Sequence, residues 1–526
     1  MPLKTSSGSR RAVFAGIFLL AVFFLFPRIA ASTEERPYFT DRGQFNYGRF
    51  LAEEGDYRTS AMEFERLIEA FPGSPLAHEA QFRLSGAYFN SGLFSKAEEN
   101  YRLFLLNFRW STLRAEAEAM ASEAHERSKT ERLPKVVLAR SDSDAAIPSL
   151  EPSSVAAIRA VQVMFFEGRN YDDISSEMRR LKEAGVDTVI IRAFHNRGDR
   201  FHRVAHSERD SGVYFSTALS PVVGDVLPEF AAIAHKNGLK VFAWMTSRYA
   251  DYGVEDSDDL SCKGYEIAIK AYTRCKGLDI FNENAVRRLE AIYSDLAATG
   301  VDGILFQDDL VLRHNEGFGP YAAALFKKDT GLAASPDELY VAGEGGNVHY
   351  TPLFWKWATW KNGRLLAVAK RLKHAAEKKK PGLKFALNLM YESVTNPPYA
   401  LAWLSQSLPE AVKAGFDYYS IMAYHRQMGA ELEMSQSEVR GLITKMTEEA
   451  SKTAGDPRRI LIKLQTIDWK TGTPLPDEEV AGLIRDIKSG PVKGLSMAVV
   501  PYRQGFPFHE LSLGSGFSAQ RAYALQ

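Results

Sequence analysis

Two adjacent carboxylates end an apolar run in the segment GVDGILFQDD, residues 300–309. The run predicts a buried strand, and Asp308 and Asp309 would place negative charge at its end. Neighbouring acids repel each other, so one of them can keep its proton to a higher pH, as a general acid must. Side chains alternate along a strand, so only one of the two would face a given site directly. The alternative is that both cap the following helix or pair with Arg313.

Seven further apolar runs also end in polar or aromatic residues. The eight predicted strands span residues 160–166, 187–194, 239–245, 302–308, 384–390, 417–424, 460–466 and 494–500. We predict that eight further residues at these strand ends bind the substrate. They are Glu167, Arg192, Trp244, Glu392, Tyr424, Gln465, Trp469 and Tyr502. Aromatic faces stack on sugar rings, polar groups hold hydroxyls, and a carboxylic acid can protonate a glycosidic oxygen. The strand ends therefore favour a polysaccharide as substrate.

The predicted strands alternate with amphipathic helices from about residue 155 to 512. Eight such units are typical of an α/β protein with a (β/α)8 TIM-like barrel, whose active site lies at the carboxyl ends of the strands. An open doubly wound sheet is the competing arrangement. It usually has a glycine-rich phosphate turn after its first strand, where this sequence has MFFEGRNYDD.

Several of these residues also have a purely structural interpretation. Trp244 can be barrel core, and His195 and His425 can be hydrogen-bonded loop residues. Arg192 and Gln465 can satisfy carbonyl groups at strand ends. The aromatic residues Phe354, Trp355, Trp357 and Trp360 recur at helical spacing, which predicts a packed helix rather than a sugar platform.

Seven segments resemble, in order and spacing, the C-terminal glycoside hydrolase domain of the PgaB family. They are AVQVMFFEGRN, DTVIIRAF, KVFAWM, DGILFQDDLVL, YYSIMAY, KLQTIDW and VVPYRQGF, and the resemblance covers residues 158–510. It implies a (β/α)8 barrel and an endo-acting hydrolase of partly deacetylated poly-β-1,6-N-acetylglucosamine, a periplasmic biofilm polysaccharide. It also implies that Asp308 carries catalysis with Asp309 beside it.

The sequence departs from that family at several points. Gln307 replaces the usual histidine, the loop at 313–316 reads RHNE instead of an acidic segment, and the final PYRQGF lacks an expected acid. The family's metal-dependent deacetylase domain is absent, so we predict neither deacetylation nor a metal site or cofactor. These changes also make a glycan other than a cationic, deacetylated one possible.

Residues 40–130 read as two helical repeats, because the pattern Gly55, Tyr57, Ser60 recurs 37 residues later. This spacing resembles tetratricopeptide repeats, and a third helix at about 111–128 would cap them. Such repeats would lean on the barrel or bind a protein partner of an export machine. A plain helical spacer is the alternative, and residues 131–154 read as a linker.

Residues 1–32 have the order of a secretory signal peptide, with basic residues, the apolar run 13–26 and small residues at 30–32. An uncleaved inner-membrane anchor is the alternative. Either way we expect a periplasmic or extracellular protein. Cys262 and Cys275 are the two cysteines of the sequence, and in an exported chain we expect them to form a disulfide.

Lys+Arg and Asp+Glu both number 65, which gives no indication of nucleic-acid binding. The sequence therefore supports three hypotheses. The first is an exported hydrolase of an amino-sugar exopolysaccharide. The second is a non-catalytic glycan-binding scaffold of an export or biofilm machine, and the third is a barrel with unrelated small-molecule chemistry.

Overall fold

The computed structural model describes residues 41–71, 74–129, 155–205, 209–254, 256–267, 269–342 and 348–512. The predicted signal peptide or anchor and the predicted linker at 131–154 lie outside these residues. Within the described part of the chain, no helix is both long enough and apolar enough to span a membrane.

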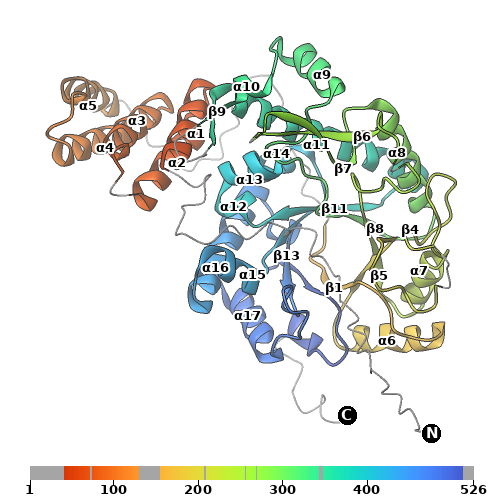
Figure 1. Ribbon diagram of the computed structural model, residues 1–526. Coiled ribbons are helices and arrows are strands. Elements are labelled where there is room, and N and C mark those ends of the chain that lie inside the picture. The colour runs from red at the N-terminus through yellow and green to blue at the C-terminus, as the bar shows by residue number, and fades with distance from the viewer. Residues whose placement is uncertain are drawn as a thin grey trace, which may run out of the picture.

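Eight parallel strands close into a barrel, as the sequence predicted (Figure 1). In chain order they are β1 (Arg159–Val163), β2 (Thr188–Arg192), β5 (Lys240–Met245), β8 (Gly303–Phe306), β11 (Lys384–Met390), β12 (Tyr418–Met422), β13 (Ile460–Gln465) and β14 (Ser496–Val500). Each strand pairs with the next, and β14 pairs with β1 to close the ring. Several strands end two or three residues earlier than predicted, because the backbone leaves the sheet there to form the loops of the mouth.

Helices cover the outside of the barrel because their apolar faces pack on the outer side chains of the strands (Figure 1). The longer ones are α6 (Tyr171–Glu183), α7 (Leu227–Lys236), α8 (Glu283–Ala297), α9 (Pro320–Thr330), α11 (Pro352–Lys379), α16 (Gln436–Ala454) and α17 (Asp477–Ser489). Shorter ones are α10 (Pro336–Leu339), α12 (Glu392–Thr395), α13 (Pro397–Leu404), α14 (Leu408–Ala414) and α15 (His425–Leu432). Two-stranded excursions rise between them, namely β3–β4 (Phe194–His195, Gly212–Val213), β6–β7 (Ser261–Glu266, Ala271–Leu278) and β9–β10 (Tyr340–Ala342, Val348–Tyr350).

The barrel interior is filled by inward side chains, not open. Phe242 of β5 contacts Tyr418 of β12 across the barrel, with 6.0 Å between ring centroids. Gly303 of β8 is required beside this pair, because a Cβ there would lie 2.6 Å from the Phe242 ring. The predicted aromatic helix is α11, in which Phe354 and Trp357 are buried.

Five helices precede the barrel and extend from it as an arm (Figure 1). They are α1 (Asp41–Glu53), α2 (Tyr57–Ala70), α3 (Ala77–Asn90), α4 (Phe94–Asn107) and α5 (Arg114–Ser128). Gly55 and Gly92, 37 residues apart, both adopt positive φ in the turns α1–α2 and α3–α4, and the tetratricopeptide-like repeat stays a prediction.

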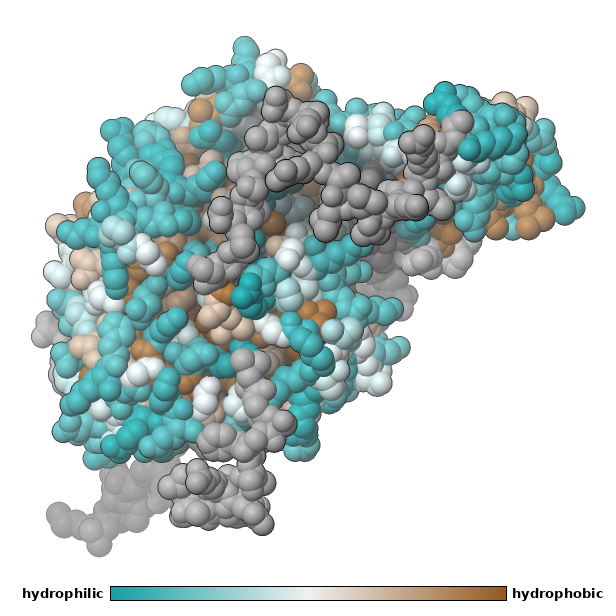
Figure 2. Space-filling view, turned by 180° about the vertical axis from the view of Figure 1, so that it is seen from behind, coloured by the Kyte–Doolittle hydropathy of each residue, from teal (hydrophilic) through white to brown (hydrophobic). Residues whose placement is uncertain are grey.

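The arm joins the barrel through α1 and α11. The Tyr47 ring lies 4.8 Å from the Trp355 ring, and Lys356 pairs with Glu54 at 3.2 Å. Seen from behind, the visible surface is largely hydrophilic, with apolar residues scattered over it (Figure 2).

Candidate active site

Asp308 lies at the mouth of the barrel, two residues beyond the end of β8, and is buried. Lys463 of β13 and Asn388 of β11 point into the same interior. The Lys463 Nζ donates to Asn388 Oδ1 at 3.3 Å although β12 separates their strands, which only inward side chains can do. The mouth therefore gathers an acid, a lysine and an amide from three strands.

Burial dominates the electrostatics of this group. It raises the pKa of Asp308, while Lys463 opposes the rise and the charge of Asp309 adds to it. Burial also lowers the pKa of Lys463 to about 8, although the nearby Asp308 favours its charged form. The expected repulsion by Asp309 is thus present but smaller than the effect of burial. A carboxyl group with a raised pKa can hold a proton for donation.

Asp309 has different surroundings from Asp308. Its carboxylate accepts hydrogen bonds from the Thr246 hydroxyl (2.7 Å), from the Ser247 amide and hydroxyl (both 2.8 Å), and from the Tyr249 amide (2.8 Å). These donors belong to the loop after β5, so Asp309 fixes that loop beside β8. The arrangement fits a positioning residue better than a proton donor, and it involves neither the following helix nor Arg313.

Two aromatic residues lie on the β12–β13 side of the mouth. The rings of Tyr424 and Trp469 are 5.3 Å apart, and both side chains are partly exposed. Burial and the charge of Asp308 raise the pKa of the Tyr424 phenol, which places Tyr424 close to the acid. These two rings are suited to contact a sugar held beside Asp308.

Several buried polar atoms near the mouth lack a hydrogen-bond partner among the described residues. Trp244 Nε1, Gln307 Oε1 and Trp469 Nε1 are among them. Trp244 also packs edge-on against Phe194 at 5.1 Å, so it is both core and a buried N–H donor. Buried polar atoms normally have partners, so these atoms are candidates to bind a polar ligand.

Arg192 and Gln465 are engaged with the backbone, as their structural interpretation predicted. Arg192 pairs with Asp199 at 3.0 Å and donates to the Arg200 carbonyl. Gln465 accepts from the Arg426 amide at 2.9 Å and donates to the Ile467 carbonyl at 2.8 Å. Both shape loops of the mouth.

The remaining predicted residues lie nearer the rim. Glu167 is exposed and pairs with Arg200 at 2.8 Å. Glu392 begins α12 just after β11 and is half-buried. Tyr502 follows β14, and its hydroxyl is hydrogen-bonded to Glu177 of α6, which directs it towards a covering helix.

The two histidines at strand ends are structural in their contacts. His195 Nδ1 lies 2.8 Å from the Tyr214 hydroxyl, and its ring stacks on Phe201. Burial lowers the pKa of His195 to about 4, so it is neutral at pH 7. His425 lies 2.8 Å from Glu479.

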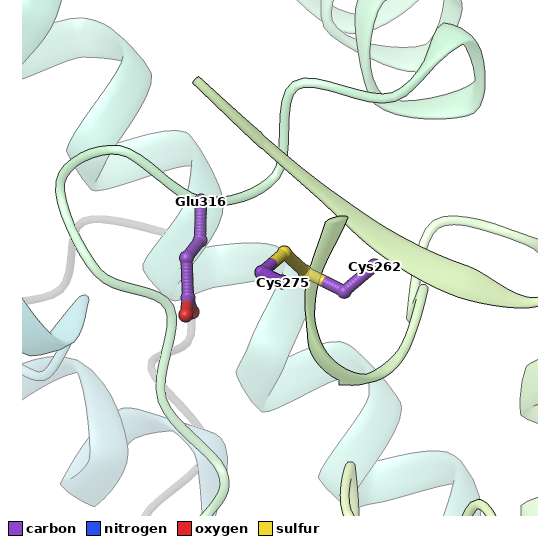
Figure 3. A group of neighbouring side chains, drawn as sticks. All are labelled: Cys262, Cys275 and Glu316. Atoms are coloured by element: carbon purple, nitrogen blue, oxygen red, sulfur yellow. A yellow bond between two sulfur atoms is a disulfide. The ribbon is translucent and has the colours of Figure 1, made fainter. Parts of the chain in front are cut away.

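Cys262 and Cys275 form the predicted disulfide, which links β6 to β7 (Figure 3). Glu316, in the loop after β8, lies beside it, with a carboxylate oxygen and the two sulfurs within 4.8 Å of one another. The two sulfurs are bonded to each other, and Glu316 pairs with buried Arg248 at 3.2 Å. These three side chains therefore do not form a metal site but a bracing point for the loops after β5 and β8.

Sequence reasoning missed Lys463 altogether. It lies within the apolar run ILIKLQT, in which a lysine inside a fully buried strand is itself a signal of function. The contact between Lys463 and Asn388 could not be predicted, because the two residues are 75 positions apart in the sequence.

Two solved structures resemble this chain, one a glycoside hydrolase domain and the other the catalytic domain of an amylase. The glycoside hydrolase domain of PgaB (BpsB) from Bordetella bronchiseptica is similar over 68% of this chain and 100% of that chain, at 22% identity and a TM-score of 0.54. The catalytic domain of a β-amylase from Paenibacillus polymyxa covers 68% of this chain and 96% of its own, at 11% identity and a TM-score of 0.43. No curated protein matches.

The family described as hypothetical glycosyl hydrolase family 13 matches residues 168–497, which is more than half of the chain and includes β2 to β13 with Asp308. The barrel seen here is also the fold of the PgaB hydrolase domain. The chain therefore belongs to hypothetical glycosyl hydrolase family 13 and is a glycoside hydrolase.

Proposed function

We propose that this enzyme cleaves an amino-sugar exopolysaccharide such as poly-β-1,6-N-acetylglucosamine outside the cytoplasm, with Asp308 as the general acid. The observation that carries the proposal is the burial of Asp308 at the mouth, beside Lys463, Tyr424 and an orphaned amide oxygen of Gln307. The similarity to the PgaB hydrolase domain supports the choice of polymer.

In this mechanism the protonated Asp308 donates its proton to the glycosidic oxygen as the bond to the anomeric carbon breaks. Lys463 keeps the pKa of Asp308 from rising further, so the acid can release the proton. Tyr424 and Trp469 support the sugar ring. The substrate's own acetamido oxygen bonds to the anomeric carbon as the glycosidic bond breaks, and water then replaces that oxygen and gives its proton to the Asp308 carboxylate, which restores the acid.

Alternatively, a carboxylate of the protein takes the place of the acetamido oxygen, as the nucleophile or the base of the reaction. Asp309 holds the loop after β5 and Glu167 is exposed at the rim, so Glu392, half-buried just after β11, is the strongest carboxylate candidate. If Glu392 acts as nucleophile or base, Glu392→Gln will abolish turnover as fully as Asp308→Asn. If the acetamido group acts, Glu392→Gln will retain most of the activity.

The test of the proposal is incubation of the full chain with poly-N-acetylglucosamine of graded deacetylation, with products read by mass spectrometry. We expect shortened chains, and a loss of at least roughly 100-fold in rate for Asp308→Asn. No shortening at any grade of deacetylation would contradict the proposal.

A second candidate function is a glycan-binding scaffold that recruits a protein of an export machine. The helical arm favours it, because α4 exposes Leu103 and Leu106 to solvent. This function predicts binding of the polymer without release of products, and it predicts that Asp308→Asn binds and behaves like the parent protein.

A further inference from the structure

A disulfide-braced hairpin, β6–β7, rises beside the candidate active site. The disulfide Cys262–Cys275 joins its two strands near the base (Figure 3). Strand β6 is also fixed to the loop after β8, since the Tyr265 amide donates to the Asn315 carbonyl at 2.8 Å. The hairpin is thus held on two sides and does not depend on its own two strands for its position.

A short chain of contacts connects the base of the hairpin to the acids of the mouth. The Tyr249 amide donates to Asp309 at 2.8 Å. The ammonium of Lys276, in β7, lies 4.2 Å from the centre of the Tyr249 ring. The outer part of β7 therefore extends from the rim of the candidate active site.

The outer part of the hairpin exposes apolar side chains. Tyr272 is 67% exposed and Ile269 is 71% exposed. Tyr272 is nevertheless held in place, because its ring packs edge-on against Tyr265 at 5.3 Å and Tyr265 is buried against Phe318. A fixed, exposed aromatic ring loses little conformational entropy when a flat ligand stacks on it.

Strand β7 is irregular between Arg274 and Leu278, so Lys276 lies in the irregular base of the hairpin, while Tyr272, four residues earlier in the strand, pairs regularly with Tyr265. Four residues of fully extended strand would place the backbones of Tyr272 and Lys276 at most about 13 Å apart. A polymer leaving the mouth can span that distance.

The hairpin is positively charged. It carries the four basic residues Lys263, Lys270, Arg274 and Lys276 against the single acid Glu266, a net charge of +3 (4 − 1). Asp258 and Asp337 pair with two of these, Lys263 and Lys270, so the net charge of the hairpin with its two paired acids is +1 (3 − 2). An ammonium-bearing, deacetylated sugar is disfavoured next to such a strand, and a neutral acetylated sugar is not.

We propose that Tyr272 forms an outer subsite, stacking on a neutral N-acetylated sugar of the same polymer several residues from the bond cleaved at Asp308. This inference rests on the proposed function and deepens it. Three observations favour this ligand, namely the position of β7 next to the mouth, the exposed ring of Tyr272 and the positive charge of the hairpin. The enzyme should therefore favour long, acetylated chains over short or deacetylated ones.

The experiment measures binding without turnover, in the full chain carrying Asp308→Asn. The probes are N-acetylglucosamine disaccharide, a fully acetylated long oligomer and a matched deacetylated oligomer, measured by calorimetry. Adding Tyr272→Ala should weaken binding of the long acetylated oligomer roughly tenfold. The ratio of the affinity for the long acetylated oligomer to the affinity for the disaccharide should therefore fall. Tyr272→Trp should restore the higher affinity for the long acetylated oligomer.

Trp110→Ala is the matched control, because Trp110 is 70% exposed but lies between α4 and α5 of the arm. Equal binding of the long oligomer with and without Tyr272→Ala would overturn the outer subsite while leaving the proposed function intact. If the Asp308→Asn chain binds none of the three probes and the parent chain cleaves none of them, the proposed function fails, and the outer subsite fails with it. A preference for the deacetylated oligomer would overturn the charge argument.

Discussion

Replacing Lys463 with methionine should stabilise the barrel at neutral pH and impair catalysis. Lys463 is buried, and burial lowers its pKa from 10.5 to about 8. Keeping the ammonium charged in the interior therefore costs stability. The pKa difference of 2.5 (10.5 − 8) corresponds to about 3 kcal/mol, at about 1.36 kcal/mol for each pKa unit. Its hydrogen bond to Asn388 returns about 1 kcal/mol. Methionine should therefore raise the free energy of unfolding by about 2 kcal/mol at pH 7.

The pH dependence of this gain has a definite sign. Between pH 8 and 10.5 the unfolded chain binds the lysine proton and the folded chain does not, so the stability of the Lys463 protein rises with pH across this window. The stability of Lys463→Met lacks that rise. The variant therefore exceeds the parent protein in free energy of unfolding most below pH 8, and the difference shrinks towards pH 10.5.

The assay is urea unfolding followed by tryptophan fluorescence at pH 7, 8, 9 and 10. Lys463→Met is best compared in the Asp308→Asn background, where no carboxylate is left without its neighbouring cation. The single variant, with Asp308 intact, reports the loss of activity. A Lys463→Met protein that is less stable at pH 7, or a difference that stays constant from pH 7 to 10, would refute the reasoning.

Three further perturbations test other parts of the structure. Asp309→Ala should lower the free energy of unfolding by about 3–5 kcal/mol and reduce activity, because it leaves the donors of the β5 loop unpaired; Asp308→Asn should reduce activity without that loss, and denaturant unfolding distinguishes them. Replacing Cys262 and Cys275 together with serine should cost about 3 kcal/mol in a local unfolding step, seen as faster amide hydrogen exchange in β6–β7; unchanged exchange there would contradict the bracing role. Gly303→Ala should lower stability by about 1–3 kcal/mol, since its Cβ would meet an aromatic ring and a carbonyl at 2.6–2.7 Å. Gly363→Ala, with open space around it, should raise stability by about 1 kcal/mol. Similar melting temperatures for the two variants would refute this prediction.

The fold could be predicted because its signals are local. Each buried parallel strand is a short apolar run, and each run is followed by an amphipathic helix, so eight repetitions predict the barrel without knowledge of any long-range contact. The disulfide was predictable for a similar reason, since its two cysteines are 13 residues apart in a chain that has no others. The ends of strands were less predictable, because the point at which the backbone leaves the sheet depends on contacts with neighbouring loops.

The candidate site was predictable in position but not in the roles of its residues. The sequence alone determined that Asp308 and Asp309 follow a buried strand and so reach the barrel mouth. Only the tertiary structure separated them, because the partners of Asp309 lie about 60 residues earlier in the chain while Lys463 lies 155 residues (463 − 308) after Asp308. Beyond the end of β8 the alternation of side chains no longer applies, so the environment of each acid is set by which distant loop packs against it. Burial and hydrogen bonding, which decide whether a carboxyl group holds a proton or fixes a loop, are properties of that packing and not of the local sequence.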